Sequence, residues 1–171
     1  TACHAFQEVY PEGKYGRIVH LTNHSSHIVK QNANGYTPVY EGKFIEQYNN
    51  HYATYKNVDK KAKYASKSKA VRLNDTSEPV ECRYFIETDF WEKISAGFDQ
   101  NYFIAWRSLT SSSNRRTMIA TLLPKIPACQ SIQVLQIADK RKMLRILSLF
   151  NSIIFDYLVR LKMTGLDLTQ T

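Results

Sequence analysis

The chain has few cysteines, and their placement argues against the usual cysteine-based frameworks. Cys3, Cys82 and Cys129 are the three among 171 residues, and they lie far apart. No two have the spacing of zinc ligands, and their odd number favours no set of disulfides. We therefore expect a reducing compartment, the cytoplasm.

Long apolar runs are also lacking. No stretch reaches the roughly 18 residues of a membrane span. The first residues, TACHAFQEVYPEGK, contain no basic segment followed by an apolar core. The sequence thus predicts neither a membrane helix nor a secretory signal. It does not begin with methionine, which favours a piece of a longer protein.

Signatures of common enzymes are missing as well. The six glycines form no phosphate loop and no dinucleotide fingerprint, and there is no nucleophile elbow. His20, His24 and His27 lie close together, but no cysteine or acid beside them completes a metal site. We interpret them as ordinary polar histidines.

Glu41 and Lys43 have the spacing of half of a nuclease site. A Glu-x-Lys on a strand is half of a nuclease site, in which carboxylates hold Mg²⁺ and the lysine steadies the attacking water. Such a site needs a second acid upstream, where only Glu8 and Glu12 are found. A turn that leads into a strand is the simpler interpretation, and a small Mg-dependent nuclease stays an alternative function.

Acidic side chains are outnumbered by basic ones, and the formal net charge is +8. This excess suits an anionic partner, with nucleic acid first and an acidic membrane surface second, although basic domains without such a partner exist. Seven basic residues and one acid, Asp59, lie in residues 56–72, where apolar residues are few. We interpret residues 56–80 as a basic, mobile surface loop.

Short segments rich in β-branched and aromatic residues predict strands, and one segment between them, residues 88–98, predicts a short helix. From Asp139 to Met163 apolar residues recur every three or four positions, which predicts one long amphipathic helix. The predicted strands are residues 16–22, 42–48, 82–87, 101–109, 116–123 and 131–137.

These elements predict a single α+β domain over residues 1–171. Its sheet is expected to be mixed or mainly antiparallel, with a short middle helix and the long amphipathic helix at the C-terminal end. The stretch SSSNRRTMIATLLP (111–124) leads from a polar connection into a strand whose partner is NYFIAWRSL (101–109). Residues 110–115 are thus the expected hairpin connection. Arginine in such a place can bond bidentately to guanine or phosphate, and serine and asparagine add short hydrogen bonds.

Four blocks of the sequence, in order, resemble the target-recognition region of type IIG restriction–modification enzymes. RIVHLTNHSSHIV (17–29) resembles the first block, with Leu21 and His24 where the family has Met and Asp. PVYEGKFIEQYNNHYATY (38–55) resembles a Pro-Leu-Tyr-Glu-Gly-Lys-Met-Ile stretch with an Ala-Thr-Tyr ending, and His51 and Tyr52 stand where an Arg and an aromatic are common.

The third block combines RYFI (83–86) with WRSLTSSSNRRTMIATLLP (106–124). The fourth, MLRILSLFNSIIFDYLVRLKMTG (143–165), resembles the family's LLxxLNSxxxDYxxRxKxxG. Residues 56–82 match nothing in the family pattern and are called the insert below. The matching residues of the last two blocks are Arg107, Asn114, Arg116, Thr117, Pro124, Asn151, Ser152, Asp156, Tyr157, Arg160, Lys162 and Gly165.

The resemblance implies a DNA-reading domain cut from an adenine-N6 DNA methyltransferase with a fused restriction endonuclease. Its partners would be double-stranded DNA and the methyltransferase domain of the same parent chain. The fragment has no Asn-Pro-Pro-Tyr and no Gly-rich S-adenosylmethionine motif. It is therefore expected to be no enzyme itself and to carry no cofactor, with S-adenosylmethionine and Mg²⁺ belonging to the parent's other domains.

Arg116 beside Thr117 matches a family position and is expected to anchor the strand, whereas Arg115 is the better candidate for reading DNA. Asp156 and Arg160 are expected to form a structural pair at (i, i+4). A module that docks on a larger enzyme through the long helix stays a further alternative. The expected DNA contacts are Lys43, Lys60, Lys61, Lys63, Lys67, Lys69, Arg72, Arg107, Asn114, Arg115, Arg116 and Thr117.

Overall fold

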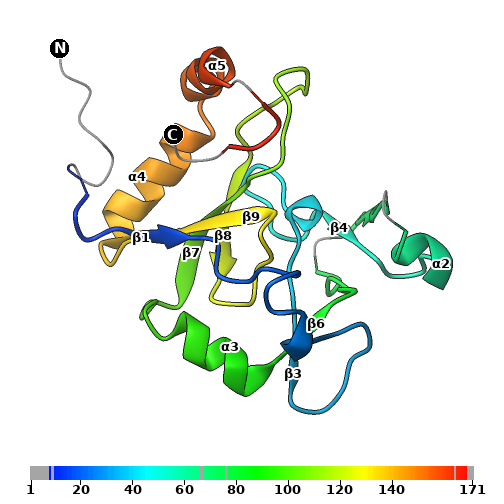
Figure 1. Cartoon of the computed structure of the whole chain (residues 1–171). Helices are drawn as coiled ribbons and strands as arrows, with labels where there is room; N and C mark the ends of the chain where they lie inside the picture. Colours follow the sequence, from blue (N-terminus) through cyan, green and yellow to red (C-terminus); the bar gives the residue numbers. More distant parts are fainter. Residues whose placement is uncertain (1–7, 9, 66–67, 76, 164, 169–171) are drawn as a thin grey trace.

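A four-stranded antiparallel sheet in the order β1-β9-β7-β8 forms the centre of the fold (Figure 1). The computed structural model describes residues 8, 10–65, 68–75, 77–163 and 165–168. β7 pairs with both β8 and β9, so the hairpin predicted from the sequence is confirmed. The strands are β1 (Lys14–Gly16), β7 (Tyr102–Arg107), β8 (Ala120–Pro124) and β9 (Ile132–Gln136).

Two smaller antiparallel sheets, β2-β6-β3 and β4-β5, complete the strand pairing. Every pairing between strands in the described residues is antiparallel, which confirms the α+β class with a mainly antiparallel sheet. The predicted short helix is confirmed as α3 (Thr88–Ser95). The other elements here are the strands β2 (Ile28–Val29), β3 (Tyr36–Pro38), β4 (Ala53–Thr54), β5 (Val71–Arg72) and β6 (Phe85–Glu87), and the 3-10 turns η1 (Ser25–His27) and η2 (Gly42–Phe44).

The central sheet is buried on both faces. Side chains alternate along each strand, so neighbouring residues pack into different clusters. In β7, Phe103 belongs to the cluster that holds Phe44 and Tyr55, whereas Ile104 belongs to the cluster under α4 (Lys140–Phe150). Burying one such side chain contributes about 1.5–3 kcal/mol. The sheet is thus packed on both faces and supports the loops at its ends.

The prediction of one long helix from Asp139 to Met163 is wrong. The chain forms α4 and then α5 (Ile153–Lys162), and Figure 1 shows the two running in different directions. Between them the Asn151 side chain donates to the Ala120 carbonyl at 2.8 Å and accepts from its N–H at 3.2 Å. The Ser152 hydroxyl caps α5 by accepting from the Phe155 N–H at 3.1 Å. Pairing with the β8 backbone therefore breaks the helix.

Other boundaries differ from the prediction for similar reasons. Of residues 16–22 only Gly16 lies in a strand, and Val19 forms an isolated bridge with Cys129. Residues 42–48 begin with the turn η2 instead of a strand. Residues 56–80 are not irregular throughout, since they hold α2 (Lys60–Lys63) and β5. Contacts with residues far away in the sequence therefore determine where the elements in these segments begin and end.

Candidate nucleic-acid interface

The connection between β7 and β8 is fastened to α5 by a buried carboxylate. Asp156 is 5% exposed, and its Oδ1 atom accepts from the N–H groups of Thr117 and Met118, both at 2.7 Å. Its Oδ2 atom accepts from the Arg160 Nε at 3.0 Å, which confirms the expected pair at (i, i+4). One helical turn of α5 therefore fixes the point where the connection enters β8.

Arg160 extends this support to the apex of the connection, which lies beside α5 at the top of Figure 1. Its guanidinium donates to the carbonyl of Ser112 at 3.2 Å and to those of Asn114 and Arg115, each at 2.7 Å. All these bonds go to main-chain atoms. The side chains of the apex are consequently left to face solvent on a backbone that is held in place.

The two arginines of this connection have different surroundings. Arg116 donates to the Asn151 carbonyl at 2.5 Å and lies 3.7 Å from Asp156, so it anchors the connection. The Arg115 side chain is exposed and makes no hydrogen bond or ion pair within the described residues. Asn114 is also exposed, with a weak 3.4 Å bond to Thr110. Arg115 thus points outward and Arg116 inward.

Thr117 and Arg107, both expected DNA contacts, are also engaged inside the fold. Thr117 is 0% exposed, so its expected contact with DNA is corrected to a structural role. Arg107 donates to the Ile45 carbonyl at 3.0 and 2.5 Å and lies 3.5 Å from Glu46, and burial lowers its pKa. Its guanidinium therefore ties β7 to the segment after η2.

Glu41 and Lys43, the half-site of the alternative nuclease, are engaged in a network of ion pairs and hydrogen bonds. Glu41 is 4% exposed, and Arg83 donates to its two carboxylate oxygens at 2.8 and 3.0 Å. Lys43 Nζ lies 3.9 Å from the same carboxylate and donates to the Tyr55 hydroxyl at 2.8 Å. The described part of the chain contains no group of three His, Cys, Asp or Glu residues placed to hold a metal ion.

This network holds the insert against the core. Arg83 donates to the Lys63 carbonyl at 2.8 Å and to the Ser68 hydroxyl at 2.5 Å. Lys43 donates to the Ser68 carbonyl at 3.1 Å, so its amine is also committed to the insert. The Glu-x-Lys spacing therefore serves to anchor a basic segment.

The insert presents several cations that have no internal partner. Lys60 and Lys61 open α2, which Asp59 caps, and both are exposed, as is Lys69. None of these three lysines makes a hydrogen bond or ion pair within the part that the structure describes. Arg72 is exposed and stacks over the Tyr52 ring at 5.5 Å.

Two further lysines of the insert are not counted among these exposed cations. Lys63 pairs with Glu81 at 2.6 Å and its side chain is only 13% exposed. Lys67 lies outside the described residues.

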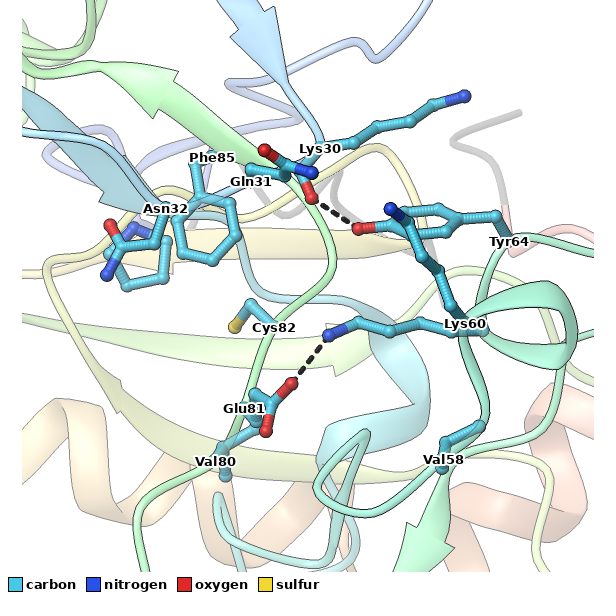
Figure 2. Close-up of a pocket in the computed structure, with 12 residues that line it drawn as sticks. Lys30, Gln31, Asn32, Val58, Lys60, Tyr64, Val80, Glu81, Cys82 and Phe85 are labelled. Carbon is cyan, nitrogen blue, oxygen red and sulfur yellow. Dashed lines mark hydrogen bonds and ion pairs between the residues drawn. The ribbon is translucent and has the colours of Figure 1, made fainter.

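A groove of about 670 Å³ runs between α2 and the segment after β2 (Figure 2). Lys60 and Tyr64 line one wall, and residues 30–32 line the other. The Tyr64 hydroxyl donates to the Lys30 carbonyl and so spans the two walls, as a dashed line in Figure 2 shows. Phe85 lies in the floor.

Sequence reasoning missed the second wall, Lys30, Gln31 and Asn32. They follow a cluster of histidines and precede a turn, and no periodicity or motif marks them. These three residues follow β2. The pairing of β2 with β6 brings them to the groove, opposite α2.

One face of α5 is apolar and exposed. Ile153 and Ile154 are 76% and 74% exposed, and Leu161 is 64% exposed. Tyr157 and Leu158 lie between them at 60% and 53%. Contiguous apolar surface of this kind marks a contact with another protein surface more often than a contact with phosphates.

Comparison of the chain with protein-family models, curated proteins and solved structures found no match. Among the described residues, no helix has the length and apolar character that crossing a membrane requires.

Proposed function

We propose that this chain binds double-stranded DNA as the target-recognition domain of an adenine-N6 methyltransferase fused to a restriction endonuclease. The observation that carries the proposal is the outward-facing Arg115 on a connection whose backbone is fixed by Asp156 and Arg160. A group that is already positioned loses little freedom on binding. Arginine can then bond bidentately to guanine or to phosphate.

The exposed cations of the insert support the same proposal. Lys60, Lys61, Lys69 and Arg72 are exposed on a segment that the Glu41–Arg83 pair anchors. Such cations attract the phosphate backbone regardless of sequence. In this proposal they position the duplex, while Arg115 and Asn114 contact bases or the adjoining phosphates.

Salt dependence tests the proposal. Binding of a fluorescent duplex of about 20 base pairs is measured by anisotropy at 50 and 200 mM salt. With about six phosphate contacts the affinity should fall roughly a thousandfold over this range. Affinity that is absent, or that does not change with salt, would count against DNA binding.

Arg115→Ala tests the role of the connection. The affinity for the preferred duplex should fall by roughly 5- to 150-fold, which corresponds to about 1–3 kcal/mol. Arg145→Ala is the matched control, because Arg145 is an exposed arginine on α4 that makes no hydrogen bond or ion pair within the described residues. Equal losses for the two variants would argue against a specific role of Arg115.

The other partners of the proposal follow from the parent enzyme. S-adenosylmethionine and Mg²⁺ would bind to its catalytic domains, and the whole would work in the cytoplasm, where the DNA is. No residue of this chain is assigned to either cofactor.

The exposed face of α5 favours docking on the parent's methyltransferase domain as a second function of the same chain. The face formed by Ile154, Leu158 and Leu161 is apolar, so it is unsuited to phosphates. Leu158→Lys should weaken association with the separately produced methyltransferase domain in sedimentation experiments. It should leave the affinity for DNA unchanged. Unchanged association would contradict docking through α5.

A further inference from the structure

We propose that the groove between α2 and residues 30–32 binds one unstacked nucleotide, with its phosphate at Lys30 and Lys60 and its base on the aromatic side chains. The inference rests on the proposed function for its biological setting. Its chemistry depends on the groove alone.

The size and lining of the groove suit a nucleotide. Its volume of about 670 Å³ lies within the roughly 300–1,000 Å³ of small-molecule sites. Tyr64 in the wall is half-buried and offers a ring surface, and stacking on such a ring tolerates every base. Phe85 is 9% exposed and adds an apolar edge to the lining. Val58 and Val80 extend the apolar lining.

Amide side chains supply the groups that a base edge needs. Gln31 and Asn32 are exposed in the wall opposite α2 and make no hydrogen bond within the described residues. Each carries both donors and an acceptor. Figure 2 shows them on the same side of the groove as Phe85, where a base in the groove would come within their reach.

The charges of the groove determine the orientation of the bound nucleotide. Lys30 Nζ lies 5.5 Å from the centre of the Tyr64 ring, and Lys60 lines the same end of the groove. At the other end in Figure 2, Glu81 is paired with Lys63 at 2.6 Å. A phosphate is therefore attracted to the Lys30 and Lys60 end, since those amines have no carboxylate partner in the described residues.

The Tyr64 hydroxyl holds the two walls together. Its single O–H is shared between the Lys30 carbonyl and the Arg83 carbonyl, which lies 3.1 Å away. Arg83 is the partner of buried Glu41, so the wall formed by α2 is fixed to the core. The groove is thus formed before a ligand arrives.

Titration with mononucleotides, followed by NMR of the labelled protein, tests the inference. Each deoxynucleoside monophosphate should shift the amide signals of residues 30–32 and 64, with a dissociation constant on the order of millimolar. Deoxynucleosides and inorganic phosphate are the comparison probes. Equal shifts with inorganic phosphate alone would overturn the inference, because they would show a simple anion patch.

A second arm uses duplexes with and without one unpaired, bulged nucleotide. If the protein has a higher affinity for the bulged duplex, and if this gain in affinity disappears in Lys60→Ala, nucleic acid is the source of the nucleotide. Mononucleotide binding without that gain identifies the free nucleotide, and the nucleotide site stands in both cases. If the protein binds no mononucleotide and shows no gain for the bulged duplex, the inference is overturned.

Two variants separate this inference from the proposed function. Lys60→Ala should weaken mononucleotide binding about 5- to 10-fold, whereas Lys61→Ala should not, because Lys61 is an exposed neighbour outside the groove lining. Arg115→Ala should weaken duplex binding and leave mononucleotide binding unchanged. If the parent protein binds mononucleotides but not the duplex, the proposed function alone is contradicted. If it binds the duplex but not mononucleotides, the groove alone is contradicted.

Discussion

At the scale of the residue, Gly42 packs where no side chain fits. A Cβ atom there would lie 2.8 Å from the Ser131 carbonyl oxygen, a backbone atom that cannot turn away. Gly42→Ala should therefore lower the free energy of unfolding by about 1–3 kcal/mol in urea titrations. Gly97→Ala is the control, because nothing lies within 4 Å of the added methyl group. Equal stability of the two variants would refute the close contact.

His24 gives a pH dependence at the same scale. Burial lowers its pKa below the ordinary 6.5, and repulsion from His20 and His27 adds to the effect. Below about pH 6.5 the unfolded chain therefore binds more protons here than the fold does. The contribution of His24 to stability should be present above pH 6.5 and fall as the pH is lowered through the folded pKa.

Urea titrations of the parent and of His24→Gln between pH 7.5 and 5 check this. The parent should lose unfolding free energy more steeply than the variant as the pH falls. If the difference in unfolding free energy between the parent and His24→Gln stays constant with pH, the lowered pKa of His24 is contradicted.

Residue roles were only partly predictable from the sequence. The charge of Arg107 and its place in a motif predicted a DNA contact, yet its guanidinium bonds the Ile45 carbonyl. Arg115 and Arg116 are adjacent and chemically alike, and the resemblance alone assigned them different roles. The bond from Arg116 to the Asn151 carbonyl confirms Arg116 as the anchor, whereas the DNA contact of Arg115 stays a prediction. A local pattern indicates which groups are present, whereas long-range contacts decide which of them are free.

At the scale of the element, α5 begins at a cap formed by the Ser152 hydroxyl. Ser152→Ala removes the bond to the Phe155 N–H and should cost about 1 kcal/mol of unfolding free energy in urea. Ser148→Ala is a matched control inside α4, where the hydroxyl donates only to the Leu144 carbonyl of its own helix. A larger loss for Ser148→Ala would argue against the cap.

The break between α4 and α5 could not be predicted, because the apolar period continues through it. Phe150 and Ile154 have the right spacing for one helix, and an asparagine and a serine between them are tolerated in helices. The bonds between Asn151 and the Ala120 backbone decide the outcome. By contrast, β7, β8 and β9 were predictable, since their own side chains supply the two buried faces.

At the scale of the whole molecule, one buried ion pair links the core to the insert. Arg83→Gln leaves the buried Glu41 carboxylate with Lys43 alone, 3.9 Å away, and should cost about 3 kcal/mol of unfolding free energy. The insert should also lose its bonds from Arg83, so trypsin should cleave faster after Lys60 and Lys61.

The control for this variant is Lys56→Ala. It removes an exposed pair with Glu78, and such pairs contribute about 0–1 kcal/mol. Its rate of cleavage after Lys61 should match that of the parent. Equal cleavage of Arg83→Gln and Lys56→Ala would show that the buried pair does not hold the insert.

The support of the β7–β8 connection has a consequence for engineering. Arg160 and Asp156 grip carbonyl and amide groups of the chain, which every amino acid except proline supplies in full. The side chains at positions 112, 113 and 115 can therefore be exchanged without removing any of those bonds. A library randomised at these three positions would vary the chemistry of the apex while its backbone contacts are retained, so it would show directly whether the connection takes part in binding.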